Sequence, residues 1–211
     1  MNNLKNIQYL IKFVSKYEYA EDLIKGKLFM RPARYFHHLE RGQGDNMEAS
    51  VASGLGLYKN MDFPLYCIYA NYNVYNNKIV IPNKLITDFK CENGYAVIIK
   101  FSDFSEALSR CDTKGYDAVG GLVRYTSKPF VNIDYFLNDK DCTNLFYKDP
   151  YFSYQQEFRF VIYKKLDNNI EYVIFNIPNI TNCAKLISVK DMEIIGENRV
   201  INLNIINDSH I

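Results

Sequence analysis

The segment at residues 154–160 constrains the fold of this chain more than any other, because polar and apolar side chains alternate along it. Successive side chains of a β-strand point to opposite faces, so the alternation predicts a strand, which we place at residues 154–163. Gln155, Glu157 and Arg159 then share one face of that strand, opposite its apolar side chains. The chain is therefore expected to contain a sheet with one hydrophobic side and one polar side.

Other apolar runs predict that this sheet has many strands. Residues 95–101 contain a continuous apolar run, which is typical of a central strand that is buried on both faces. A turn at residues 167–169 is expected to connect the strand at 154–163 to a hairpin partner at 170–175. Further strands are expected at residues 10–14, 27–30, 65–72, 78–81, 121–125, 192–195 and 200–206.

Helical spacing of apolar residues is confined to a few short segments. The first helix is expected at residues 16–25, where Ser15 and Glu18 have the spacing of a capping box and Gly26 suits the C-terminal end. A second helix, at residues 103–111, carries its apolar side chains on one face. Short helices placed early, followed by many strands, predict an α+β fold with a mixed or antiparallel sheet and not repeated βαβ units.

The composition indicates one globular domain, residues 1–211, since 48% of the side chains are apolar and the chain is long enough to bury a core. A net charge of +1 excludes the strong global field that drives nonspecific binding to nucleic acids or membranes. We expect no membrane span, because no run of about 18 apolar residues occurs. Five scattered cysteines and the lack of an export signal predict reduced thiols and a cytoplasmic location.

Two interpretations of the polar strand face remain open. Gln155 and Glu157 could line a cleft, where a carboxylate accepts a hydrogen bond from a ribose hydroxyl or stabilises an oxocarbenium-like cation. The same residues could instead form an ordinary solvated sheet face, with Glu157 and Arg159 paired to neighbouring strands.

A second candidate group lies in a glycine-rich loop, where Asp45 and Glu48 follow Gly44. With Glu157 they could form a carboxylate cluster that holds Mg²⁺ for phosphodiester chemistry. The alternative is a short helix that Asp45 caps, with Glu48 at its third position. No metal site built on histidine is expected, because two of the three histidines are adjacent and point in different directions.

A third candidate group follows the predicted strand at residues 27–30. Arg31 and Arg34 could grip the pyrophosphate of a dinucleotide, while Tyr35 stacks on one of its rings. Arg159 is a further candidate for binding the same cofactor. The alternative is a strand end with exposed basic side chains and buried aromatic rings.

Several segments, taken in order, resemble an uncharacterised group of phage-borne and bacterial proteins. The matching blocks are residues 24–30, 35–36 with Glu40, 44–48, 95–101, 122–125, 146–148 and 154–159. That group is distantly similar to ADP-ribosyltransferases, which carry a Q-x-E or E-x-E element on a late strand, and Gln155 with Glu157 matches this element. The resemblance implies an ADP-ribosyltransferase-like fold with a split β-sheet, NAD as cofactor, Glu157 as the catalytic carboxylate and Gln155 as a residue that orients the substrate.

These observations lead to one main hypothesis and two alternatives. The main hypothesis is an NAD-using, ADP-ribosyltransferase-like protein that acts in phage–host conflict on a protein or nucleic acid of the host cell. The first alternative is a non-catalytic inhibitor of the anti-defence or anti-CRISPR type, because the predicted first strand has no Arg or His where such enzymes place their first NAD contact. The second alternative is a nuclease that uses Mg²⁺ at Asp45, Glu48 and Glu157.

Overall fold

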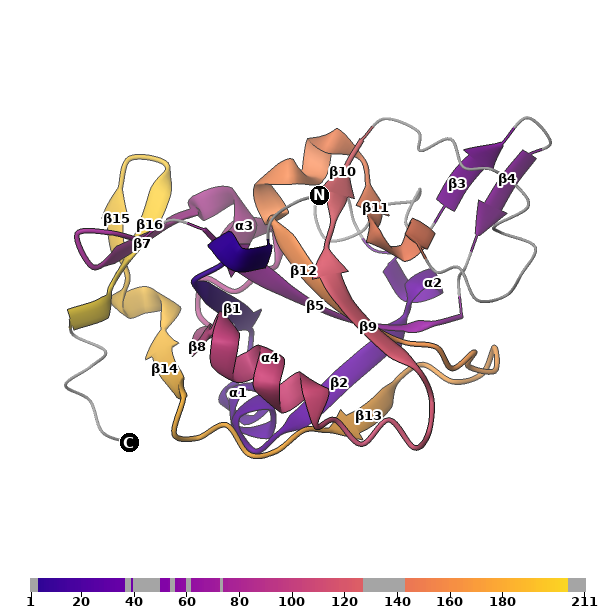
Figure 1. The fold of residues 1–211 in the computed structure, drawn as a ribbon. Helices are drawn as coiled ribbons and strands as arrows, with labels where there is room; N and C mark the ends of the chain where they lie inside the picture. The colour runs from indigo at the N-terminus through magenta and orange to yellow at the C-terminus, as the bar shows by residue number, and fades with distance from the viewer. Residues whose placement is uncertain are drawn as a thin grey trace. The chain divides into compact units, whose positions relative to one another are not determined.

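The computed structural model describes residues 4–36, 39, 50–53, 56–59, 62–72, 74–126 and 143–204. The fold is mixed α+β, with mostly antiparallel strands and a few short helices, as the sequence predicts (Figure 1). The chain divides into two compact units: unit 1 comprises Met1–Lys27, Ile68–Cys111 and Asn176–Ile211, and unit 2 comprises Leu28–Cys67 and Asp112–Phe175. The single domain expected from the sequence stays a prediction.

The sheet of unit 1 is built around β1 (Tyr9–Val14) and β8 (Tyr95–Lys100), which pair antiparallel along their whole lengths. The second half of β5 (Pro64–Asn71) pairs with β1, and β14 (Ala184–Ser188) pairs with the other edge of β8. The prediction of a central strand at residues 95–101 is thus confirmed. Strand β14 is not predicted from the sequence, because residues 184–188 lack a clear alternation of polar and apolar side chains.

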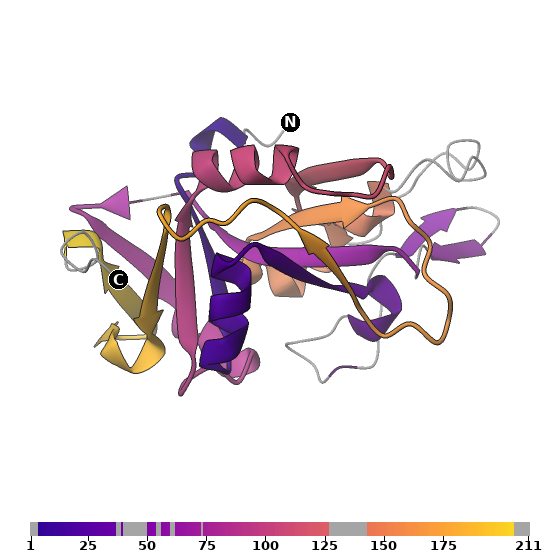
Figure 2. The same cartoon turned by 90° about the horizontal axis from the view of Figure 1, so that it is seen from below.

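Among the described residues of unit 1 there are three α-helices: α1 (Tyr17–Ile24), α3 (Asn83–Asp88) and α4 (Phe101–Ser109). Both α1 and α4 pack against β1 and β8 (Figure 2). Helix α4 buries Phe104, Ala107 and Leu108 on one face, as predicted, but it begins two residues early because the chain turns directly from β8 into it. The predicted capping box of α1 is wrong, because Lys16 is the N-cap residue and makes no side-chain capping hydrogen bond.

Gly26 ends α1, and here the prediction from the sequence is confirmed. Its φ of +91° lies in the left-handed region, which favours glycine. A Cβ atom at this position would lie 2.2 Å from the backbone oxygen of Ile177, and Ile177 in turn donates its N–H to the oxygen of Gly26 at 2.8 Å. Glycine is therefore required both by the backbone conformation and by the close approach of another segment of unit 1.

A second, four-stranded sheet also belongs to unit 1. Its strands pair antiparallel in the order β15 (Glu193–Ile195), β16 (Asn198–Asn202), β7 (Lys78–Pro82) and β6 (Val74–Tyr75). The predicted pair of closing strands joined through Gly196 is confirmed by β15 and β16, although β16 ends before residue 206. Two short 3-10 helices, η1 (Leu4–Asn6) and η4 (Val189–Asp191), complete the unit.

Unit 2 contains residues 154–163, where the alternation of polar and apolar side chains predicts a strand. Strand β12 occupies Glu157–Ile162 and pairs antiparallel with β9 (Ala118–Leu122). A Cβ atom on Gly120 of β9 would lie 2.8 Å from Cζ of Phe158, so the glycine leaves room for this ring. All six residues of β12 are buried, so its polar face is not solvated.

Two predictions about this segment are wrong. Residues 154–155 are not in the strand, because Pro150–Gln155 form the 3-10 helix η3, which Asp149 caps by accepting a hydrogen bond from the N–H of Tyr151. The strand predicted at residues 170–175 exists in part, but it does not form the expected hairpin with β12. Strand β13 (Val173–Asn176) pairs with β2 (Lys27–Pro32) instead, because the chain leaves β12 at Tyr163 and follows a long connection back.

The rest of unit 2 consists of short elements around a compact core. They are α2 (Ala33–Phe36), β3 (Ser50–Ser53), β4 (Gly56–Lys59), β10 (Arg124–Tyr125), η2 (Thr143–Phe146) and β11 (Tyr147–Lys148). Strands β10 and β11 pair in parallel. One buried hydrophobic cluster of the unit comprises Ala33, Phe63, Leu65, Leu145 and Val161. In the part of the chain that the structure describes, no helix is long and apolar enough to cross a membrane.

Candidate functional site

Glu157 stands at the point where η3 gives way to β12. Gln156 adopts a left-handed conformation, with φ 40° and ψ 51°, and this reverses the chain between the helix and the strand. The backbone N–H of Glu157 donates to the hydroxyl of Tyr125 at 2.8 Å, and its backbone oxygen accepts from the N–H of Val123 at 2.9 Å. These two hydrogen bonds hold the first residue of β12 against Tyr125 of β10 and against Val123, the residue directly before β10.

The side chains of Gln155 and Glu157 converge on one cation, the ammonium group of Lys148 on β11. Lys148 Nζ donates to Gln155 Oε1 at 2.6 Å and to Glu157 Oε1 at 2.7 Å. On the other side of the carboxylate, Arg159 Nε donates to Glu157 Oε2 at 2.8 Å, and Arg159 Nη2 lies 2.7 Å from the same oxygen. We call these four residues the Glu157 cluster: Lys148, Gln155, Glu157 and Arg159.

Every member of the Glu157 cluster is buried, with exposed fractions of 5% for Lys148, 1% for Gln155, 6% for Glu157 and 1% for Arg159. Burial by itself raises the pKa of Glu157, but the positive charges of Arg159 and Lys148 lower it by more, so the pKa lies below that of an ordinary glutamate. The carboxylate therefore stays ionised at neutral pH.

The two cations make further contacts that hold them in place. Arg159 Nη1 donates to the backbone oxygen of Leu145, and Lys148 Nζ lies 4.9 Å from the centre of the Phe152 ring. The cluster thus ties together four elements, η2, β11, η3 and β12. A buried ion pair with this many hydrogen bonds positions backbone segments, and removing one partner is costly.

The Glu157 cluster, as placed, does not fit a nicotinamide dinucleotide. Each carboxylate oxygen of Glu157 already accepts from a charged donor, and Oε1 of Gln155 accepts from Lys148. A ribose hydroxyl would have to reach a side chain that is 6% exposed and displace one of these donors.

The arginines of the third candidate group, Arg31 and Arg34, have different partners in the structure. Arg34 forms an ion pair with Asp62, with Nη1 and Oδ1 2.6 Å apart, and donates from Nη2 to the backbone oxygens of Asp167 and Ile170 at 2.8 and 2.7 Å. Its guanidinium thus has a structural role within unit 2. Arg31 lies instead beside Tyr35, with its Cζ atom 3.8 Å from the centre of that ring.

The glycine-rich loop that contains Asp45 and Glu48 lies outside the described residues, so the proposed Mg²⁺ cluster stays a prediction. Within the described ranges, no group of three or more His, Cys, Asp or Glu side chains is arranged to hold a metal ion. Lys148 is the member of the Glu157 cluster that was not selected from the sequence. A single lysine in a short segment does not by itself indicate a functional residue. Residues 146–148 are, however, among the blocks that resemble the phage-borne group.

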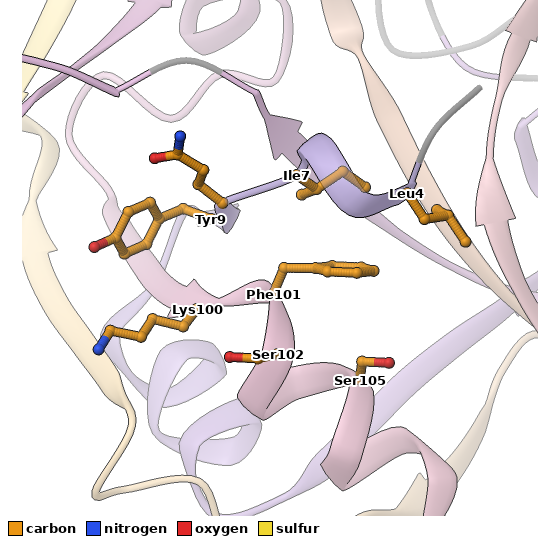
Figure 3. A pocket seen from close by; sticks show the side chains of 8 residues that line it. Leu4, Ile7, Tyr9, Lys100, Phe101, Ser102 and Ser105 are labelled. Atoms are coloured by element: carbon orange, nitrogen blue, oxygen red, sulfur yellow. The ribbon is translucent and has the colours of Figure 1, made fainter.

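Unit 1 contains a separate pocket with a volume of about 580 Å³ (Figure 3). Its lining residues are Leu4, Ile7, Gln8, Tyr9, Lys100, Phe101, Ser102 and Ser105. Phe101 extends between Ile7 and Ser105 toward Leu4, while Tyr9 and Lys100 lie at the other end (Figure 3). No residue selected from the sequence lines this pocket.

Comparisons of the chain with protein-family models, with curated proteins and with solved structures found no match.

Proposed function

We propose that this chain acts by binding a macromolecular target in the host cell, as a non-catalytic inhibitor of the anti-defence type. One observation carries the proposal: the carboxylate of Glu157, the best candidate for catalysis, is buried and hydrogen-bonded to both Lys148 and Arg159. A catalytic carboxylate must touch its substrate, whereas this one is used to hold four segments of unit 2 together. Binding through the surface does not need Glu157 to be accessible.

The biological setting comes from the resemblance to phage-borne and bacterial proteins. A protein of this kind would bind a host defence complex, such as a CRISPR effector, and block it without turning over a substrate. The absence of Arg and His from β1, where ADP-ribosyltransferases place their first NAD contact, supports the same conclusion.

The proposal is tested by two measurements on the purified chain. The first follows nicotinamide release from NAD and the transfer of label from labelled NAD to proteins and nucleic acids of a host extract. We expect neither above the level of a heat-denatured sample. The second follows phage plating on a host with an active CRISPR system, where expression of the chain should raise the plating efficiency. Turnover of NAD that is lost in Glu157→Gln would refute the proposal.

A second candidate function is an ADP-ribosyltransferase-like enzyme with an ADP-ribosyltransferase-like split sheet. It is favoured by one observation, namely that Gln155 and Glu157 point to the same place, as a Q-x-E element requires. Activity would require Lys148 or Arg159 to release the carboxylate when NAD binds. In that case Lys148→Met should increase the rate of nicotinamide release, whereas a purely structural cluster predicts no turnover in either protein.

A further inference from the structure

A row of aromatic rings with one arginine in it lies on the exposed side of β2 and β13 in unit 2. The rings of Phe29 and Tyr172 stack, with centres 4.6 Å apart and an angle of 25° between their planes. The guanidinium of Arg31 continues the row, with its Cζ atom 5.2 Å from the centre of the Phe29 ring and 3.8 Å from that of Tyr35. We call these four residues the aromatic row: Tyr35, Arg31, Phe29 and Tyr172.

Two rings of the row, Phe29 and Tyr172, are exposed, while Arg31 and Tyr35 are half-buried. Phe29 and Arg31 are two residues apart on β2 and share a face, while Leu28, Met30 and Pro32 point into the core. Phe29 remains 45% exposed and Tyr172 49%, although apolar rings of this size are more stable when buried. Ile174 on β13, 42% exposed, extends the apolar surface beyond Tyr172. Neighbouring apolar side chains of this kind are typical of a surface that another molecule covers.

Arg31 is held between two rings and has no anionic partner among the described residues. Its guanidinium contacts two rings, but within the described residues it makes no hydrogen bond and no ion pair. Arg34, three residues later, shows the contrast, since its guanidinium has a carboxylate and two carbonyl oxygens as acceptors. The rings thus orient the planar fork of N–H groups on Arg31, and no acceptor in the described part of the chain uses these donors.

We propose that the aromatic row is the surface that binds a protein partner, and that this partner presents a carboxylate to Arg31 with apolar side chains on both sides of it. A guanidinium fork binds a carboxylate with two parallel hydrogen bonds, and the rings supply apolar contact area around the pair. Tyr and Arg are enriched among the residues that dominate protein–protein binding energy. The inference rests on the proposed function, because it names the surface through which a binding protein would act.

A nucleic acid is the less suitable partner for this surface. The affinity of a protein for a nucleic acid depends on several lysines or arginines that each neutralise a phosphate. Of the two arginines near the row, Arg34 is already paired with Asp62, and the acidic residue Glu171 lies directly before Tyr172. One cation among apolar rings matches one carboxylate on an apolar protein surface better than a chain of phosphates.

The test uses a displayed library of linear 12-residue peptides, selected in parallel on the wild-type chain and on Arg31→Ala. We expect the wild type alone to enrich peptides that carry Asp or Glu beside apolar residues. Synthetic copies, measured by fluorescence anisotropy, should bind Arg31→Ala about 10- to 100-fold more weakly, the range for loss of one charge-assisted hydrogen-bonded pair. Replacing the peptide's Glu by Gln should weaken its binding to the wild type by the same factor as Arg31→Ala does. The same replacement should leave the peptide's binding to Arg31→Ala unchanged.

Arg124→Ala is the matched control, because Arg124 is an exposed arginine of the same unit and lies on β10; it should leave the affinity unchanged. Melting curves show whether each variant is folded, and Arg31→Lys, which keeps the charge but lacks the fork, should still lose most of the affinity. The proposal is overturned if no peptide is enriched over Arg31→Ala, if enriched peptides lack a carboxylate, or if a 20-residue oligothymidine binds through Arg31 while the peptides do not. NAD turnover that depends on Glu157 would overturn the proposed function and leave this surface intact.

Discussion

Replacing Glu157 by Gln should destabilise the protein far more than the change of one atom suggests. The carboxylate accepts from Lys148 Nζ at 2.7 Å and from Arg159 Nε at 2.8 Å, and it is 6% exposed. Glutamine keeps the shape but removes the negative charge, so two buried cations lose the anion between them. Breaking a buried ion pair by removing one partner costs about 3–5 kcal/mol. Because small proteins are stable by only about 5–15 kcal/mol, this is a large fraction of the total.

The assay is urea denaturation followed by circular dichroism, with the free energy of unfolding extrapolated to water. Glu106→Gln is the control, because Glu106 pairs with Arg110 at 3.2 Å on α4 while both side chains are at least 60% exposed. An exposed helical pair contributes about 0.3–0.5 kcal/mol, so the control should differ little from the wild type. A loss below about 1 kcal/mol in Glu157→Gln would refute the view that the cluster holds unit 2 together.

The remaining predictions concern the pH dependence of stability and one glycine. Because the folded pKa of Glu157 lies below the unfolded value of about 4.3, its stabilising contribution is complete above that pH and is lost as the pH falls toward the folded pKa. The urea midpoint of the wild type should therefore fall more steeply below pH 4 than that of Glu157→Gln, and parallel curves would contradict this. Gly26→Ala should cost at least about 2 kcal/mol, since a Cβ would meet Ile177 O at 2.2 Å in a left-handed conformation. Gly115 also has a positive φ, +82°, but a Cβ atom added there would have no atom within 4 Å. Gly115→Ala therefore measures the cost of the backbone conformation without a clash, and it should lower the stability in thermal melts by only about 1–2 kcal/mol.

Signals that depend on a few neighbouring residues predicted the fold well. The continuous apolar run at residues 95–101 identified the central strand β8, and Gly26 identified the end of α1. The apolar face of α4 was also predicted correctly, although the helix begins earlier than expected. These features could be predicted because strand burial, helix termination and helical periodicity are set by side chains close together in the sequence.

Alternation along residues 154–160 predicted a strand, and part of it exists, but the first residues form η3 instead. The competing signal was local as well: Asp149 and Pro150 favour the start of a helical turn, and Gln156 accepts a left-handed conformation to leave it. The hairpin at residues 170–175 failed for a different reason. Pairing between strands is decided by the whole sheet, and here β2 is the partner of β13.

By itself, the sequence determined that Glu157 and Arg159 lie on one face of a strand in an α+β protein with mostly antiparallel strands. The tertiary structure decided what that face meets. Lys148, from a separate strand, covers the carboxylate on one side, and Arg159 holds it on the other, so the polar face became a buried ion-pair network. A strand's period specifies the direction of each side chain, but whether water, a ligand or another segment lies there depends on contacts between residues distant in the sequence.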